Sequence, residues 1–200
     1  MADTLDLSSY DVFYENGGWR YGFVREWLWH RRHLVRRFGL RRGRRMIEVA
    51  CGIGFHTNLY CRMGFECVGF DANETAVRIA RERYPRRTFQ VADARGDLPF
   101  EANTWDVVIT RGCSLYHYDL ALPRTHETTA NLLRYLRPGG LFVLIIATDL
   151  SGRRDAGRIW QNTLEDYQQH FAAHGSNASV DWHKGMVICG LRKEAVPAGT

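Results

Sequence analysis

The chain has 200 residues, of which 45% are hydrophobic, and its formal net charge is +5 at pH 7. These values are typical of one soluble globular domain that buries a core of its own. No apolar run reaches the roughly 18 residues that span a bilayer, and the polar, acidic start "MADTLDLSSYD" is unlike a secretory signal. We therefore expect neither a membrane span nor secretion, and we expect a cytoplasmic location.

The cysteines and arginines narrow the class of protein further. The five cysteines are scattered and form no CxxC pair, which argues against a disulfide framework or a zinc site. Arginine supplies 25 of the 27 basic residues, and ten of these arginines lie between Arg20 and Arg45. Such a segment is usually a solvated helix face. Nucleic-acid binding is the sharper alternative, but the chain carries no appended RNA-binding module.

The first 44 residues are predicted to form an N-terminal arm and a capping helix. Residues 8–22, "SSYDVFYENGGWRYG", are aromatic and contain glycine, which favours an irregular arm. Residues 24–38 repeat apolar side chains at helical spacing, and Gly39 is the expected C-cap. Arg31 falls on the apolar face, so its side chain must snorkel or pair. The expected apolar face consists of Val24, Trp27, Leu28, Leu34, Val35 and Phe38.

From residue 45 onward the chain alternates between strand and helix patterns. Strands are predicted at 45–50, 66–71, 88–93, 105–110 and 141–148, and helices at 55–63, 73–84, 121–136 and 164–173. Asn73 is the expected N-cap of the second of these helices, and Pro138-Gly139-Gly140 breaks the third. Two final runs, 179–183 and 186–193, flank a Lys184-Gly185 turn, which predicts an antiparallel hairpin.

Strands that alternate with helices in this way predict an α/β fold with a doubly wound, mostly parallel sheet. The closing hairpin adds an antiparallel edge to that sheet. We expect three parts in the chain: the arm and capping helix over residues 1–44, the main domain over 45–193, and a tail over 194–200.

Two motifs at the ends of neighbouring predicted strands indicate a nucleoside site. The first strand ends at Glu48 to Ala50, so the Gly52-Ile53-Gly54 turn lies where ligands bind in an open α/β sheet. Glycines there permit positive φ and close approach of a ligand, and the next helix offers free N–H groups. Asp71 ends the second strand about 20 residues later, where an acid can accept both hydroxyls of a ribose.

The details of the turn favour a nucleoside without phosphates. A dinucleotide fingerprint requires a third small residue, and Thr57 stands at that position. Glu48 suits a positively charged amino group, whereas it would repel a pyrophosphate. The predicted ligand is therefore a nucleoside that carries an ammonium, and a nicotinamide enzyme is the last of the alternatives.

At this point the chain resembles the class I S-adenosylmethionine-dependent methyltransferases from about residue 45 to residue 193. "EVACGIG" matches the first motif of that family, with Ala50 where glycine is commoner. "VGFDAN" matches the second acid, "VADA" the adenine-edge motif, "WDVVITRG" the fourth strand, and "LRPGGLFVL" the loop into the fifth strand. "GGWRYG", "GFHT" and "RGCSLYHYD" resemble a subgroup that acts on small molecules. The resemblance implies a Rossmann-like sheet of seven strands.

The resemblance also implies a cofactor, S-adenosylmethionine, which leaves as S-adenosylhomocysteine. Glu48, Gly52 and Gly54 would surround its methionine part, Asp71 would hold the ribose, and Asp93 with Ala94 would bracket the adenine. Arg111 would line the methyl-donor end, and His56 could touch the cofactor carboxylate or the substrate. The full set of expected cofactor-binding residues is Tyr21, Glu48, Ala50, Gly52, Gly54, His56, Asp71, Ala72, Asp93, Ala94 and Arg111.

Methyl transfer from a sulfonium is an in-line displacement that requires alignment, exclusion of water, and a base if the nucleophile carries a proton. No metal is required. His117 has a pKa range suited to neutral pH, although it could be an ordinary loop histidine. Tyr116 and Asp149 are further candidates for the base, and Asp149 could instead serve a turn.

The aromatic residues of the arm complete the expected site. They could simply pack on the domain, but we favour a lid over the donor pocket, because aromatic faces attract a sulfonium. Cys113 is expected to be a small wall residue. The expected substrate-binding residues are Tyr14, Trp19, Cys113 and Tyr116.

The sequence therefore predicts a methyltransferase that acts on an O or N nucleophile of a small-molecule acceptor. One alternative is an enzyme that methylates RNA or another macromolecule through the arginine-rich face. Another is a protein that binds S-adenosylmethionine but performs other chemistry or only senses it. The acceptor and the oligomeric state stay open at this level.

Overall fold

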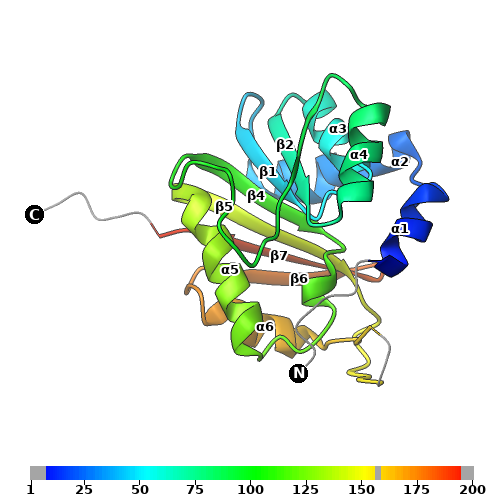
Figure 1. Ribbon diagram of the computed structural model, residues 1–200. Coiled ribbons are helices and arrows are strands. Elements are labelled where there is room, and N and C mark those ends of the chain that lie inside the picture. Colours follow the sequence, from blue (N-terminus) through cyan, green and yellow to red (C-terminus); the bar gives the residue numbers. More distant parts are fainter. Residues whose placement is uncertain (1–7, 156–158, 195–200) are drawn as a thin grey trace, which may run out of the picture. The chain divides into compact units, whose positions relative to one another are not determined.

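The computed structural model describes residues 8–155 and 159–194. Of the predicted tail, only Glu194 lies inside the described residues. Seven strands form one sheet in the order β3-β2-β1-β4-β5-β7-β6. Figure 1 shows the strands and the helices that connect them. The expected α/β fold, with a mostly parallel seven-stranded sheet and antiparallel C-terminal strands, is confirmed. The chain divides into two units, Met1–Ala92 and Asp93–Thr200.

The first unit contains three parallel strands and the two helices that connect them. In the pairing of neighbouring strands, Ile47 lies opposite Val68, and Asp71 lies opposite Val91. The strands are β1 (Arg45–Val49), β2 (Glu66–Asp71) and β3 (Thr88–Val91), and the connecting helices are α3 (Phe55–Met63) and α4 (Glu74–Arg83).

Local signals in the sequence explain where these helices begin and end. Asn73 caps α4, because its side-chain oxygen accepts the N–H of Ala76 at 2.7 Å, as predicted. Gly64 ends α3 at a φ of 98°, a conformation that glycine adopts without steric cost. Met46 and Ile47 of β1 are fully buried, as expected for a strand covered on both faces.

The predicted irregular arm contains a helix, α1 (Ser8–Glu15). It packs beside α4, as Figure 1 shows. The Asn73 side-chain amide donates to the carboxylate of Asp11 at 2.8 Å, which ties the arm to the start of α4. The arm is therefore more ordered than its glycine and aromatic content indicated, because α4 offers it a surface and a polar partner.

The predicted capping helix has the expected extent but buries a different face. It comprises α2 (Phe23–His30) and a π-helical segment, η1 (Arg31–Arg36), and ends near Gly39, where φ is 64°. Val24 and Leu28 are exposed, whereas Glu26 and His30 are buried. The expected apolar face is thus wrong at its N-terminal half.

Arg31 behaves as expected for a basic residue beside apolar side chains. Its guanidinium lies over the ring of Trp27, with 5.2 Å between its Cζ and the ring centroid. An arginine can cover an aromatic face in this way while its charge stays in water.

The described residues of the second unit form four strands and three helices. β4 and β5 are parallel, and β7 pairs antiparallel with both β5 and β6. α5 packs on β4 and β5, and α6 packs on β6 and β7. The elements are β4 (Trp105–Arg111), η2 (Ser114–Tyr116), α5 (Pro123–Tyr135), β5 (Leu136–Ala147), α6 (Leu164–Ala172), β6 (Ser179–His183) and β7 (Met186–Arg192).

The central strand β5 begins earlier than predicted. It starts at Leu136 instead of residue 141, because Leu136 already pairs with Trp105 before the register shifts. Phe142 and Val143 of β5 are fully buried. Across the described residues, the helices are too short or too polar to cross a membrane.

Candidate active site

The turn after β1 is built from backbone conformations that side chains rarely tolerate. Ala50, Gly52 and Gly54 have φ angles of 55°, 50° and 80°. A Cβ on Gly54 would lie 2.6 Å from Cζ of Phe89, so only glycine fits there. Ala50 holds the same left-handed conformation with a methyl group, which explains physically why glycine suits this position better.

Asp71 and the glycine turn, which were predicted from separate motifs, lie together in the first unit. The Gly52 N–H donates to Asp71 Oδ2 at 2.8 Å, and the Asn73 N–H donates to Oδ1 at 3.0 Å. The side chain is buried, and burial raises the pKa of its carboxyl group. A carboxylate offers about four lone-pair directions, so Asp71 retains capacity to accept hydroxyls from a ligand.

Thr57 holds the side chain of Glu48, a contact that the sequence did not predict. The Thr57 hydroxyl donates to Glu48 Oε2, and both side chains are buried. Gly69 on β2 leaves the space that this contact needs, because a Cβ there would overlap the Thr57 hydroxyl. The threonine that breaks the dinucleotide fingerprint therefore positions the first acid.

The aromatic arm lies against the same turn. A Cβ on Gly52 would be 3.3 Å from Cε1 of Tyr14, so the Tyr14 ring lies over this glycine. The Tyr21 ring centroid is 4.6 Å from that of His56. Trp19 remains 69% exposed, with its edge near the ring of Phe13. Tyr14 and Tyr21 thus lie close to the expected cofactor residues, whereas Trp19 faces outward.

His56, expected at the ligand, contacts a buried acid of the capping helix. Its Nε2 lies 3.3 Å from Oε2 of Glu26, and His30 Nδ1 lies 2.8 Å from the backbone oxygen of Glu26. All three side chains are buried. Glu26 and His30 were not among the predicted site residues, although their spacing of four residues, which places both on one helix face, was a usable signal.

In the second unit, the expected adenine-edge residues follow β3. Asp93 pairs with Arg95, whose Nη2 lies 2.6 Å from Oδ2, and this hydrogen bond lowers the pKa of the carboxyl group. Ala94 is buried, and its backbone oxygen accepts the side-chain amide of Asn131 at 2.9 Å.

The loop after β4 carries His117, one of the expected candidates for the base. Arg111 ends the strand, Gly112 follows with a φ of 74°, and Cys113 is buried. Burial lowers the pKa of His117 to about 4, so its ring is neutral at pH 7. Its Nδ1 is buried and has no hydrogen-bond partner among the residues that the structure describes.

The other two candidates for the base are less suited to that role. Tyr116 is fully buried, its hydroxyl lies 3.0 Å from Thr129 Oγ1, and burial raises its pKa. Asp149 is exposed; it accepts the N–H of Ser151 at 2.9 Å and pairs with Arg153 at 3.1 Å. Hydrogen bonds from Ser151 lower the pKa of Asp149. This is the arrangement of a turn, so His117 is the strongest of the three.

Comparison with known proteins agrees with the fold and the turn. Residues 46–140 match the methyltransferase domain family. A protein of Mycolicibacterium smegmatis named "Probable S-adenosylmethionine-dependent methyltransferase" is 31% identical over 126 residues, which cover 62% of this chain and 47% of that protein. The ubiquinone/menaquinone biosynthesis C-methyltransferase of Idiomarina loihiensis is 30% identical over 156 residues, with coverages of 72% and 58%.

The fold has relatives of more than one named activity. The solved structure of the [4+2]-cyclase SpnF superposes with a TM-score of 0.69 at 17% identity, over 96% of this chain and 94% of that one. The chain spans about half the length of the curated relatives it matches. The expected resemblance to the class I S-adenosylmethionine-dependent methyltransferase superfamily is confirmed by the match over residues 46–140 and by these relatives.

Proposed function

We propose that the protein transfers a methyl group from S-adenosylmethionine to a nucleophilic atom of a small-molecule acceptor. The observation that carries the proposal is the 2.8 Å hydrogen bond from the Gly52 N–H to Asp71, which joins the glycine turn to the second acid. Both features lie within residues 46–140, which match the methyltransferase domain family.

The residues of the first unit fit this cofactor in charge and shape. Buried Glu48 offers a negative charge to an ammonium, and Asp71 offers free lone pairs to two ribose hydroxyls. Gly52 and Gly54 keep the turn free of side chains, so backbone can approach the ligand. Nothing in this set favours a pyrophosphate, because both acids would repel it.

His117 is the residue that we propose to remove a proton from the acceptor. The ring is neutral at pH 7, and its buried Nδ1 has no hydrogen-bond partner among the described residues, so this nitrogen can take up a proton once an acceptor reaches it. Its loop follows the carboxyl end of β4, and ligands of open α/β sheets bind beyond the carboxyl ends of the strands. Tyr14 and Tyr21 would exclude water from the donor, which favours displacement over hydrolysis.

An O or N nucleophile is the proposed acceptor atom. A relative is named as a quinone C-methyltransferase, which supports a small molecule and makes methylation at carbon an outcome to be tested. Screening metabolites for uptake of labelled methyl, with mass analysis of each product, would identify the acceptor and the atom.

Cofactor binding is tested by calorimetry with S-adenosylmethionine and S-adenosylhomocysteine. Asp71→Asn should weaken binding about 10- to 100-fold, because charged hydrogen bonds contribute about 1.5–3 kcal/mol. Asp97→Asn is the matched control, since Asp97 pairs only at the surface and its side chain is 90% exposed. If neither cofactor form binds, or if both variants bind like the wild type, the proposal fails.

Two alternative functions predict different results in the same assays. A macromolecular acceptor bound through the arginine-rich face would give activity that falls steeply with salt, whereas turnover of a neutral metabolite would not. Non-methylating chemistry, as the name of the cyclase relative illustrates, would consume an acceptor without releasing S-adenosylhomocysteine.

A further inference from the structure

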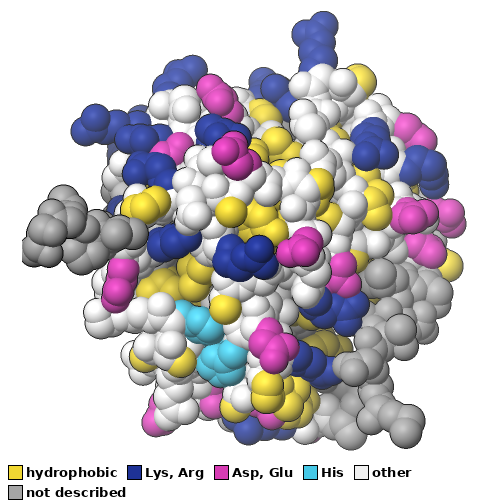
Figure 2. All heavy atoms as spheres, turned by 60° about the vertical axis from the view of Figure 1, so that its left-hand side comes forward, with side chains coloured by type: hydrophobic (Ala, Val, Ile, Leu, Met, Phe, Trp, Pro, Cys, Tyr) yellow, Lys and Arg dark blue, Asp and Glu magenta, His cyan; other side chains and the backbone are white. Residues whose placement is uncertain are grey.

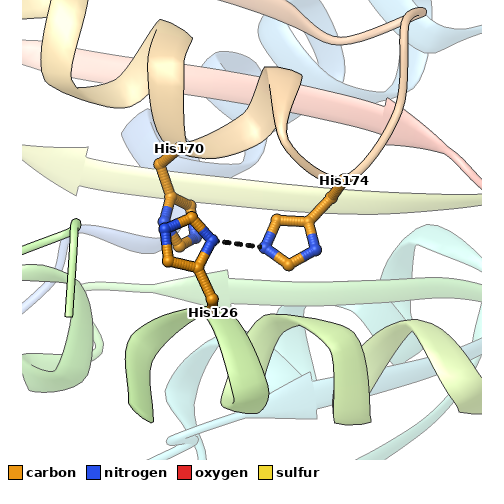
Figure 3. Close-up of side chains that lie close together, drawn as sticks. All are labelled: His126, His170 and His174. Atoms are coloured by element: carbon orange, nitrogen blue, oxygen red, sulfur yellow. Dashed lines mark hydrogen bonds between the residues drawn. The ribbon is translucent and has the colours of Figure 1, made fainter. Parts of the chain in front are cut away.

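Three histidines of the second unit lie together between two helices. His126 is on α5, His170 is on α6, and His174 follows Ala173, the C-cap of α6. Figure 3 shows the three rings facing one another between these helices. The ring centroid of His126 lies 4.4 Å from that of His170 and 5.2 Å from that of His174. One nitrogen from each residue lies within 4.8 Å of the others.

We propose that His126, His170 and His174 bind one divalent transition metal ion of the zinc class. Imidazole nitrogen is a preferred ligand of such ions, and three ligands with one water complete a tetrahedron. With bonds of about 2.0 Å, ligand nitrogens in a tetrahedron lie about 3.3 Å apart. Nδ1 of His126 and Nε2 of His174 are already 3.1 Å apart. One nitrogen of each of the three rings lies within 4.8 Å of the others, so small movements of the rings would bring all three within reach of one ion.

His170 has the supporting contact that metal-binding histidines usually have. Its Nδ1 lies 2.8 Å from the backbone oxygen of Leu120, so Nδ1 carries the proton and donates it. This bond fixes the tautomer and leaves the lone pair on Nε2, the nitrogen available to a metal.

The present partner of His170 Nε2 can be displaced at little cost. Nε2 lies 2.9 Å from the hydroxyl of Thr129. That hydroxyl also lies 3.0 Å from the backbone oxygen of Thr125 and 3.0 Å from the hydroxyl of Tyr116. If a metal ion takes Nε2, Thr129 keeps one acceptor and one donor, so no buried polar group loses its last partner.

Access from solvent also favours the ion. His126 and His174 are half-buried, and Figure 2 shows histidine side chains gathered at the surface of one face. An ion can therefore enter from solvent.

The spacing of the cysteines, which predicts no zinc site, contains no information about a site made of histidines. His126 and His170 are 44 residues apart, so their approach depends on how α5 and α6 pack. The spacing of His170 and His174, four residues apart at the end of a helix, is the only local part of the pattern.

The test uses the full chain without an affinity tag, titrated with Zn²⁺ against a competing chromophoric chelator, and with Co²⁺ followed by visible absorption. The wild type should bind one Zn²⁺ per chain at this site and give the d–d bands of tetrahedral Co²⁺. His126→Gln and His174→Gln should each weaken Zn²⁺ at least about 30-fold. Both side chains are half-buried, so we expect the variants to fold, which circular dichroism checks.

His183→Gln is the control, because His183 is a half-buried histidine of the same unit outside the cluster. It should bind Zn²⁺ like the wild type. The proposal is overturned if the double variant of His126 and His174 binds Zn²⁺ as tightly as the wild type, or if the wild type binds no Zn²⁺. This outcome is independent of methyl transfer, since no cofactor or acceptor takes part in the measurement.

Discussion

Gly54→Ala should destabilise the protein strongly, because two separate costs meet at this residue. The left-handed backbone, with a φ of 80°, costs about 1–2 kcal/mol for any side chain. The added Cβ would also lie 2.6 Å from Phe89 Cζ and 3.0 Å from Ala80 Cβ. Overpacking of this kind costs about 1–3 kcal/mol. The free energy of unfolding should therefore fall by about 2–5 kcal/mol.

Phe89 cannot move aside easily, which is why the clash should be felt. Its ring is 4% exposed and packs in a cluster with Cys51, Val77 and Ala80. Proteins pack such clusters as densely as organic crystals, so a displaced ring needs its neighbours to shift as well. The strain therefore spreads through the core beneath the glycine turn.

Gly43→Ala separates the two costs. Gly43 has nearly the same φ, 77°, but no atom lies within 4 Å of an added Cβ. The free energy of unfolding of Gly43→Ala should therefore fall only by the cost of the left-handed backbone, about 1–2 kcal/mol. Urea unfolding followed by fluorescence and circular dichroism measures both variants. Equal losses for Gly43→Ala and Gly54→Ala would refute the packing argument.

A double variant tests independently whether Phe89 is the residue that an added Cβ on Gly54 would contact. In the double variant Gly54→Ala with Phe89→Leu, the branched side chain no longer reaches the position of Phe89 Cζ. The two changes should then be non-additive, with a favourable coupling of about 1 kcal/mol or more. Strict additivity would show that Phe89 is not the obstacle.

Three further predictions follow from individual residues. Ala50→Gly should raise the free energy of unfolding by about 0.5–1 kcal/mol, because relief of the positive φ exceeds the entropy cost of glycine; urea unfolding checks this, and a loss would contradict it. The pKa of His170 is lowered to about 4 in the fold, so the unfolded chain takes up its proton first and stability falls as the pH drops from about 7 towards 4. The free energy of unfolding should fall by about 2 kcal/mol between pH 7 and pH 5 for this reason. The variant His170→Gln should not show this fall when its unfolding is measured over the same pH range. His117→Gln should lower kcat about 10²-fold or more while calorimetric affinity for S-adenosylmethionine stays unchanged; an unchanged kcat would remove His117 as the base.

Local signals in the sequence sufficed for most elements and for the glycine turn. The bounds of α3, β2 and β6 agree with the prediction residue by residue. Asn73 capped α4 as expected, since a cap depends on bonds made within three residues. The proximity of Asp71 to the turn was also predictable, because neighbouring parallel strands end at the same edge.

Burial of polar side chains could not be read from the sequence. The apolar pattern placed Val24 and Leu28 inside, yet Glu26 and His30 are buried there. Their burial is stabilised by polar contacts, one of them from His56, 30 residues away along the chain. A periodic pattern measures hydrophobicity along one helix, and it contains no information about a distant partner that makes a buried charge acceptable.

The chemistry of individual candidates was likewise decided by tertiary structure. Tyr116 and His117 are neighbours in the chain, but packing buries the tyrosine hydroxyl against Thr129 and leaves the Nδ1 of His117 without a partner among the described residues. His126 of α5 meets His170 of α6 and the following His174 only because those helices pack together. The sequence by itself determined the elements and the glycine turn, which depend on local bonds and strand order. Tertiary packing alone decided which ionisable groups are desolvated and which of them meet, because desolvation and contact depend on residues far apart in the chain.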